Sequence, residues 1–332
     1  MLSLKTASLR PSDRLLGLNR SPMSNPPVLR AAVIGLGRMG MNHVRACVDT
    51  PGIELAAILD HKPDWAVHVG TETQSLVAPD VSSLFGKVDF AIVAVPTVDH
   101  AATAVPLLQQ GVSCLVEKPV SVSESDAKMI ITAAEQGSAV LQVGHIERFN
   151  PAICTLHEHL KEGSAVTRIV ARRHNSPQDR TYDIDAVLDL MIHDLELLSL
   201  FTNQDVSDVR VSSGATEHAV KAGFTIGGEI SVELSADRKT GSPVREMIVE
   251  TEDSIYTVDF TSQQLHRTSQ QLHRLTPTGG EEISVEREDA LRRQLKAFAK
   301  ATGSGTVEGA TGNDGLTALQ LANQIRSMAG LI

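Results

Sequence analysis

Hydrophobic residues from position 28 to 150 lie in short continuous runs, which amphipathic segments separate. Continuous apolar runs are typical of parallel strands that are buried on both faces of a sheet. The pattern predicts strands at 28–34, 53–59, 90–95, 112–116 and 139–143, with helices at 41–48, 63–69, 100–110 and 123–136. Ser123 and Asp126 at the start of the last helix are spaced as a capping box. This alternation favours an α/β domain with a parallel sheet.

The pattern changes after residue 150. We expect a helix at 152–162, a strand at 165–172, a polar stretch at 174–183 and an apolar helix at 184–201. Antiparallel strands are expected at 206–212, 220–226, 228–236, 245–251 and 254–260. A polar loop then covers 261–280, and helices follow at 286–301 and 315–328, the last one capped by Asn313 or Asp314. Residues 28–150 and 151–332 are therefore predicted to be two domains with a functional site at their junction.

Residues 1–27 carry four basic side chains against one acid, Asp13, and contain no continuous apolar segment. A secretory signal requires such a segment, so none is expected. We interpret this stretch as a disordered leader, or as sequence upstream of a true start at Met23, with an organellar presequence as the remaining alternative. The fold prediction therefore starts at residue 28.

Composition narrows the classes of function. The chain of 332 residues has a hydrophobic fraction of 42% and a net charge of −10 at pH 7, which argues against a nucleic-acid partner. No apolar run reaches the about 18 residues that cross a bilayer. Cys47, Cys114 and Cys154 show no C-x-x-C spacing. We therefore expect free thiols, no metal site and a cytoplasmic location.

A glycine-rich turn, V-I-G-L-G-R-M-G at 33–40, links the first strand to the first helix. In a dinucleotide-binding turn Gly35 would permit the tight turn, Gly37 would let the backbone approach a pyrophosphate, and Gly40 would let the helix pack closely. The free N–H groups of the helix start favour phosphate, so Arg38 and Met39 are expected to contact the cofactor as well.

Asp60 ends the second strand, twenty residues after Gly40. A carboxylate there accepts hydrogen bonds from the ribose hydroxyls of NAD and repels the 2′-phosphate of NADP. His61 and Lys62 follow directly and would soften that preference. A plain strand–helix turn in another kind of α/β protein would not need Asp60. The sequence thus predicts a Rossmann domain that binds NAD, with NADP the less favoured cofactor.

The third predicted strand also ends in polar residues, and ligands of such sheets bind beyond the carboxyl ends of the strands. It runs into Val95, Pro96 and Thr97, with His100 three residues on. We expect these four residues to contact the cofactor. A helix cap and a first-turn histidine are the alternative interpretation of Thr97 and His100.

The next strand runs into Glu117, Lys118 and Pro119. The proline would make the turn rigid, Glu117 would orient the ammonium or hydrogen-bond the nicotinamide ribose, and Lys118 would point toward the reacting carbon. A surface salt bridge on a turn is the alternative. On the helix at 184–201, Asp189 and His193 stand four residues apart and therefore share one face. Such polar groups are costly to bury without a purpose, the alternative being a structural Asp–His pair.

These motifs together resemble the Gfo/Idh/MocA family of oxidoreductases. The resemblance rests on G-L-G-R-M-G at 35–40, Asp60, V-P-T-V-D-H at 95–100, E-K-P at 117–119 and D-L-M-I-H-D at 189–194. It implies an N-terminal Rossmann domain at 28–150 and a C-terminal α/β domain at 151–332 with an open, mostly antiparallel sheet. One face of that sheet would bind substrate, and the other would form a homodimer or homotetramer. Asp194, the last acid of its motif, is expected to hold structure or to orient His193.

The resemblance also implies that Lys118, His193 and Asp189 are catalytic. Oxidation of an alcohol by a nicotinamide needs a base for the hydroxyl proton and a cation for the developing negative charge. His193 and Lys118 suit these roles, and the sequence leaves open which of the two is the proximal base. Asp189 would orient His193 or hold a substrate hydroxyl.

Within the family, segments 144–152 and 188–197 are most similar to the UDP-N-acetylglucosamine 3-dehydrogenase group. This similarity implies NAD-dependent oxidation of a sugar 3-hydroxyl. Arg148, Arg172 and Arg173 are then expected to grip the diphosphate, with Asn150 and His193 also at the substrate; solvated or interface arginines are the alternative. The alternative functions are a free polyol or sugar dehydrogenase of the inositol dehydrogenase type, and a dinucleotide-binding regulator without turnover.

Overall fold

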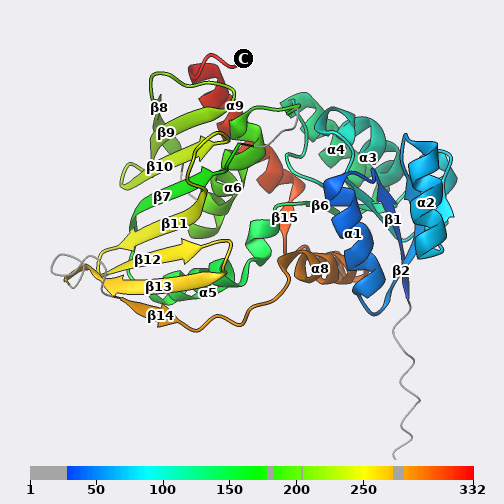
Figure 1. Cartoon of the computed structure of the whole chain (residues 1–332), viewed down its shortest axis with the longest axis horizontal. Helices are drawn as coiled ribbons and strands as arrows, with labels where there is room; N and C mark the ends of the chain where they lie inside the picture. Colours follow the sequence, from blue (N-terminus) through cyan, green and yellow to red (C-terminus); the bar gives the residue numbers. More distant parts are fainter. Residues whose placement is uncertain (1–27, 178–181, 203–204, 272–279) are drawn as a thin grey trace, which may run out of the picture.

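The computed structural model describes residues 28–177, 182–202, 205–271 and 280–332, which form a seven-stranded and an eight-stranded sheet (Figure 1). The prediction for residues 1–27 lies outside the described residues. The predicted fold class is confirmed, because a parallel Rossmann-type sheet is followed by a mostly antiparallel one.

The first sheet has the strand order β15-β6-β5-β4-β1-β2-β3, in which strands β1 to β6 are parallel. Alternate residues of β1 enter two separate cores: Ala32 and Ile34 on one face, Ala31 and Val33 on the other. Burial on both faces explains the continuous apolar runs. The strands are β1 (Leu29–Ile34), β2 (Ile53–Leu59), β3 (Leu76–Val77), β4 (Phe90–Val93), β5 (Ser113–Val116) and β6 (Leu141–Val143), and the helices are α1 (Arg38–Asp49), α2 (Pro63–Thr73), α3 (His100–Gln109) and α4 (Glu124–Gly137).

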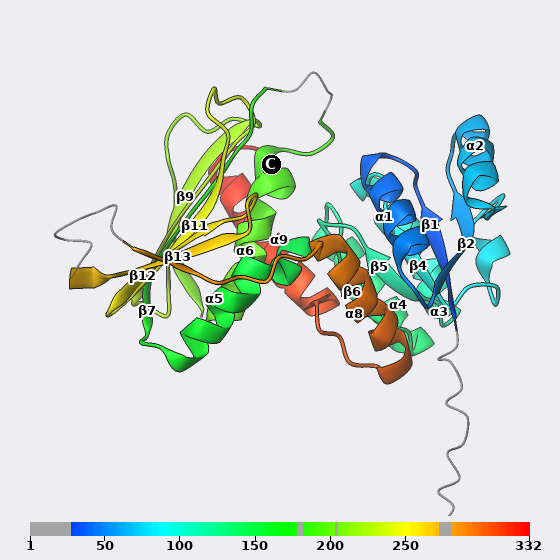
Figure 2. The same ribbon diagram turned by 60° about the horizontal axis from the view of Figure 1, so that its bottom comes forward.

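The second sheet has the order β14-β13-β12-β11-β7-β10-β9-β8, and its neighbours are antiparallel except for β7 and β10. Helices α5 (Pro151–Glu162), α6 (Ile192–Phe201) and α9 (Gly312–Met328) cover one face, whereas the opposite face has no helix of the described residues on it (Figure 2). The strands are β7 (Val166–His174), β8 (Val206–Val211), β9 (Ala219–Ile226), β10 (Ile230–Asp237), β11 (Val244–Thr251), β12 (Ser254–Asp259), β13 (Gln264–Ser269) and β14 (Glu281–Ile283).

The prediction of a polar loop at 261–280 is wrong for its described part. Strand β13 pairs with β12, and β14 then pairs with β13. Leu265 is completely buried in the core and is the residue that anchors β13. Its polar neighbours lie at an exposed edge of the sheet, where the hydrophobic alternation that marks a half-buried strand is lost.

Three helix starts differ from the prediction because side chains cap the backbone at other residues. Asp185 Oδ1 accepts hydrogen bonds from the N–H groups of Val187 and Leu188, so a π-helical turn, Val187–Met191, precedes α6 in place of a helix from residue 184. Helix α8 (Ala290–Ser304) starts after the cap Asp289, and α9 starts after Thr311, not Asn313 or Asp314. Asp314 completes the capping box of Thr311.

The predicted boundary at residue 150 is incomplete, because the chain returns to the first sheet near its end. Strand β15 (Ala310–Thr311) pairs with β6, and α8 packs against α1. Phe298 of α8 is fully buried and meets Phe90 of β4 edge to face, with ring centroids 5.4 Å apart. Residues 290–311 therefore belong with the Rossmann sheet, since their apolar side chains complete its second core.

Candidate active site

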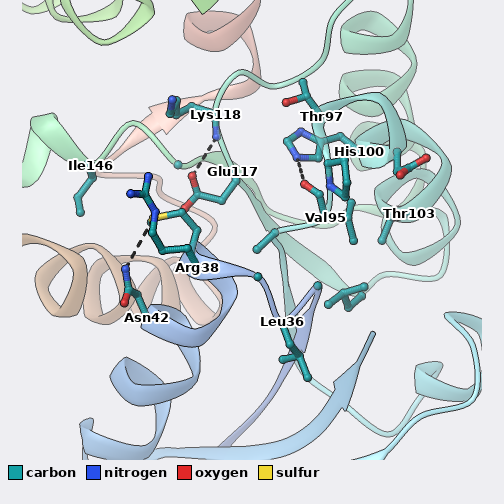
Figure 3. A pocket seen from close by; sticks show the side chains of 18 of the residues that line it. Leu36, Arg38, Asn42, Val95, Thr97, His100, Thr103, Glu117, Lys118 and Ile146 are labelled. Carbon is teal, nitrogen blue, oxygen red and sulfur yellow. Dashed lines mark hydrogen bonds between the residues drawn. The ribbon is translucent and has the colours of Figure 1, made fainter. Parts of the chain in front are cut away.

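A cleft of about 1820 Å³ lies where the two sheets meet. The glycine turn, the ends of β4 and β5, the π-helical turn and strands β7 and β11 all contribute to its wall. Figure 3 shows Glu117 and Lys118 at the end of β5, near Arg38 and Asn42 of α1, with Thr97 and His100 at the start of α3. The predicted functional site at the junction is therefore one continuous cleft.

The glycine turn has the geometry that a dinucleotide needs. Gly35 has φ +88°, and a Cβ there would lie 2.6 Å from the Ala94 carbonyl oxygen. A Cβ on Gly40 would lie 1.8 Å from the Gly35 carbonyl oxygen, so no side chain fits. A Cβ on Gly37 would meet no atom within 4 Å, and no side chain caps α1 at this residue. The start of α1 thus presents its N–H groups to an open cradle, which fits a pyrophosphate.

Asp60 supports the turn from the end of β2. Its Oδ2 accepts the N–H of Leu36 at 2.6 Å, and its Oδ1 accepts the N–H of Lys62 at 2.9 Å. Trp65, which the sequence reasoning missed, donates its Nε1–H to the Leu36 carbonyl at 3.0 Å and also lines the cleft. Asp60 and Trp65 therefore bind the backbone N–H and C=O of Leu36, next to the cradle.

Val95, Pro96, Thr97 and His100 all line the cleft. His100 is buried, and its Nε2 lies 3.1 Å from the Val95 carbonyl oxygen while its Nδ1 lies 3.1 Å from that of Pro119. Burial lowers the pKa of His100 and keeps it neutral. These contacts join the loops after β4 and β5, so His100 stabilises the cleft wall.

Glu117 makes a buried contact that the sequence did not predict. Its Oε1 lies 2.7 Å from Nε2 of His43 on α1, and its Oε2 accepts the N–H of Lys118 at 3.2 Å. Gly144 faces it, and a Cβ there would lie 3.1 Å from Glu117 Cδ. Burial raises the pKa of Glu117, but the His43 hydrogen bond and the nearby positive charges outweigh burial and leave it below its usual value. The carboxylate is thus charged and held from two sides.

Lys118 and Asp189 meet across the junction. Lys118 Nζ donates to the Asp189 carbonyl oxygen at 2.7 Å and lies 3.4 Å from its Oδ1. Asp189 Oδ2 lies 3.4 Å from Nε of Arg238, which is almost fully buried. Burial lowers the pKa of Lys118, and Asp189 and Glu117 oppose that shift. The ammonium therefore stands in the cleft at a fixed position.

His193 lines the same cleft, one helical turn after Asp189. Its Nδ1 is buried and has no hydrogen-bond partner among the described residues. Burial, followed by the charges of Lys118 and Arg173, lowers its pKa well below the usual value. The ring of His145 lies edge-on to it, with centroids 6.3 Å apart, and burial lowers the pKa of His145 to about 3. His193 is therefore a neutral imidazole that can accept a proton.

The structure brings only one of the three predicted arginines to the cleft. Arg173 lines it but is already paired, through Nη1 with Glu147 and through Nε with Asp194, each at 2.8 Å. Arg172 is exposed on the opposite face of β7, where it pairs with Glu246. Arg172 therefore does not reach the cleft as predicted, because successive residues of a strand point to opposite faces.

Neither Arg148 nor Asn150, which were predicted to contact the substrate, lines the cleft. Arg148 pairs with the buried Glu196 and donates to Ser199 Oγ at 2.9 Å. Asn150 caps α5 by accepting the Ala152 N–H at 3.1 Å. Both side chains join the end of the Rossmann sheet to the helices of the second sheet, so their polar groups stabilise the junction itself.

Residues 29–145 match the family model described as an oxidoreductase family with an NAD-binding Rossmann fold. The chain is also 31% identical, over 306 residues, to the UDP-N-acetylglucosamine 3-dehydrogenase of Acidithiobacillus ferrooxidans, covering 90% of this chain and 96% of that protein. The chain belongs to the Gfo/Idh/MocA family of oxidoreductases. A crystal structure of that same 3-dehydrogenase superposes with a TM-score of 0.83 at 30% identity, covering 90% of this chain and 97% of the other. The predicted family resemblance is confirmed.

The chain is also 26% identical over 200 residues to the inositol 2-dehydrogenase of Acidothermus cellulolyticus, covering 58% of this chain and 59% of that protein. Family membership and the 3-dehydrogenase similarity together support a dehydrogenase that acts on CH–OH groups. Among the described residues, no helix is long and apolar enough to cross a membrane, and no cluster of side chains has the make-up of a metal site.

Proposed function

We propose that this enzyme oxidises the 3-hydroxyl of a UDP-N-acetylhexosamine to a ketone, with NAD as the cofactor. The main support is the placement of Lys118, which its 2.7 Å bond to Asp189 fixes in the cleft that His193 also lines. The substrate class is taken from the similarity to the A. ferrooxidans enzyme. With the pyrophosphate of NAD bound in the glycine cradle, its nicotinamide would accept the hydride of the alcohol carbon.

His193 and Lys118 act on the substrate alcohol in different ways. His193 is neutral, so it takes the hydroxyl proton as the general base. Lys118 donates a hydrogen bond to the same oxygen and stabilises the negative charge that develops there. Asp189 holds the ammonium, and its buried contact with Arg238 keeps the carboxylate oriented. Glu117 stays charged next to Lys118 and supports the loop that carries it.

We further propose that NAD is preferred over NADP. The Asp60 carboxylate lies at the cleft wall beside the cradle, and its negative charge opposes a 2′-phosphate. The other predicted contacts of the cofactor all line the same cleft, and they are Arg38, Met39, Val95, Pro96, Thr97, His100, Glu117 and Lys118.

The uncovered face of the eight-stranded sheet is proposed to join copies of the chain into a dimer or tetramer. On this face the partly buried Ile248 of β11 lies next to its cross-strand partner Val170 of β7, which is buried, between the ion pairs of Arg168 and Arg172. Apolar residues ringed by charged pairs are typical of a subunit interface.

The formation of NADH at 340 nm tests the function directly. The purified chain is mixed with NAD and, separately, with UDP-N-acetylglucosamine, UDP-N-acetylgalactosamine, N-acetylglucosamine and myo-inositol. We expect the largest kcat/KM with a UDP-N-acetylhexosamine. Turnover of myo-inositol alone would favour the polyol dehydrogenase that the 26% identical relative represents. Binding of NAD with no turnover of any of these alcohols would contradict the proposed function and favour the regulator.

A further inference from the structure

Arg245 is a cation of the cleft that the sequence reasoning missed. It lies on β11, and its Nε and Nη2 donate to one atom, Asn175 Oδ1, at 3.3 and 3.0 Å. Both residues line the cleft. Among the described residues no carboxylate stands at ion-pair distance from this guanidinium, and the neutral Asn175 is its only hydrogen-bond partner. The side chain is thus positioned without being neutralised.

Its neighbour Arg173, unlike Arg245, is paired with carboxylates. The two arginines are directly paired across β7 and β11, and they share the face of the sheet that looks into the cleft. Arg173 is buried and already paired with Glu147 and Asp194. The carboxylates that attract Arg245 from a distance are Glu147 and Asp189, but these already pair with Arg173, Lys118 and Arg238. Arg245 therefore keeps hydrogen-bonding capacity for an anion.

The position of Arg245 also indicates which anion it meets. Arg38 beside the glycine turn repels Arg245 across the cleft, as does Arg173 from its own sheet. The positive charges around Arg245 favour a ligand with negative oxygens in this part of the cleft. The start of α1 is the proposed site of the cofactor phosphates on the Rossmann side. Arg245 stands on the opposite wall, on the eight-stranded sheet, near Asn175 at the end of β7.

We propose that Arg245, held by Asn175, binds the diphosphate of a sugar nucleotide and so selects this substrate over free sugars. The naming of the diphosphate rests on the proposed function. A guanidinium with free N–H groups binds phosphate oxygens through paired, charge-assisted hydrogen bonds. A free hexose offers only neutral hydroxyls at this position, and these exchange one hydrogen bond with water for another. Arg245 thus takes the role that the sequence assigned to Arg148 and Arg172.

The test compares Arg245→Met and Asn175→Ala with the wild type. Arg267→Met serves as the control, because Arg267 lies on the same sheet, is partly exposed and does not line the cleft. Steady-state kinetics give kcat and KM for UDP-N-acetylglucosamine and for NAD. Calorimetry on the NAD-bound protein gives the affinity for UDP and for N-acetylglucosamine, and thermal unfolding verifies that each variant is folded.

For Arg245→Met we expect KM for the UDP-sugar and Kd for UDP to rise about 10- to 100-fold, the usual scale for a charge-assisted pair. Asn175→Ala, which only loosens the guanidinium, is expected to raise them about threefold to tenfold. KM for NAD stays within twofold, and Arg267→Met behaves as the wild type. Unchanged affinity for UDP in Arg245→Met, or a loss that falls on NAD instead, would overturn the proposal.

Different results would refute the proposed function and the proposed anion site. A wild type that binds UDP through Arg245 but does not oxidise UDP-N-acetylglucosamine would refute the reaction and still support the anion site. A wild type that oxidises UDP-N-acetylglucosamine with the same KM as Arg245→Met would refute the anion site alone. Absence of any UDP binding to the NAD-bound wild type would also refute the anion site.

Discussion

His43 and Glu117 form a buried pair, with Nε2 and Oε1 2.7 Å apart, that ties helix α1 to the end of strand β5. The side chain of His43 is completely buried. Helix α1 begins at the glycine turn, and the residue after Glu117 is Lys118, whose N–H the same carboxylate accepts. The cradle for the cofactor and the proposed catalytic lysine therefore share one rigid support, which fixes their relative position.

Breaking this pair is expected to cost stability. His43→Ala leaves the Glu117 carboxylate buried with one partner fewer, so the free energy of unfolding should fall by about 3–5 kcal/mol. Urea unfolding at pH 7 of His43→Ala, Glu117→Gln and the double variant gives the coupling between the two residues, which we expect at about 0.5–3 kcal/mol. His68→Ala is the control, because His68 and Glu72 form an exposed pair on α2, and its effect is expected within about 0.5 kcal/mol. Additive effects of the two single changes would contradict the pairing.

The pH dependence of catalysis follows from the shifted groups. The pKa of His193 lies well below its usual 6.5, so the imidazole is already in its neutral form at pH 6.5. We therefore expect no fall in kcat/KM when the pH is lowered from 8 to about 6.5. The pKa of Lys118 lies below 10.5, so its ammonium is lost as the pH rises through a value lower than that of a free lysine. We expect an alkaline limb of kcat/KM that begins below pH 10.5. In Lys118→Arg, which cannot deprotonate, a limb at the same pH would show that another group is responsible.

Removal of either proposed catalytic group should slow the chemical step. Lys118→Ala and His193→Ala are each expected to lower kcat about 10²- to 10⁴-fold, the usual scale for acid–base and electrostatic groups, with a smaller change in the affinity for NAD. Lys128→Ala, which changes an exposed lysine of α4, serves as the control in the same assay. Near wild-type turnover in His193→Ala would make this histidine structural and leave the proton to Lys118.

Asp60 is expected to set the cofactor preference by its charge. Asp60→Asn keeps an oxygen that can accept the Leu36 N–H but removes the negative charge, so the glycine turn stays in place while the repulsion of a 2′-phosphate is lost. We expect the ratio of kcat/KM for NAD to that for NADP to fall about tenfold or more. Asp64→Asn, in the first turn of α2, is the matched control. Equal kcat/KM values for the two cofactors in the wild type would refute the preference.

The open sheet face offers a test of assembly. Ile248→Arg places a charge among the apolar residues of that face, so the proposed interface should lose its apolar contact and dissociate. Light scattering coupled to size exclusion should show the mass of the variant falling to the 35.6 kDa of one chain. Val67→Arg, an equivalent change on the exposed surface of α2, is expected to leave the mass unchanged. A wild type that is already a monomer would rule out this interface.

The sequence by itself determined the Rossmann sheet, the glycine cradle and the strand end that carries Lys118. These features depend on local rules: continuous apolar runs mark buried parallel strands, Gly35 needs a positive φ, and the carboxyl ends of parallel strands meet at one edge. Strand alternation was also readable, and it could have excluded one of Arg172 and Arg173 from the cleft.

Tertiary structure alone decided which charged residues face that edge. Arg148 pairs with Glu196 of α6, which lies 48 residues away in the chain. Arg173 pairs with Asp194, which lies 21 residues away and neutralises its charge. Arg245 reaches the cleft because β11 pairs with β7 in a register that places it opposite Arg173. Phe298 likewise joins the second core of the Rossmann sheet only because the chain folds back. Such pairings depend on strand order and on competition between distant partners, which no local pattern of residues encodes.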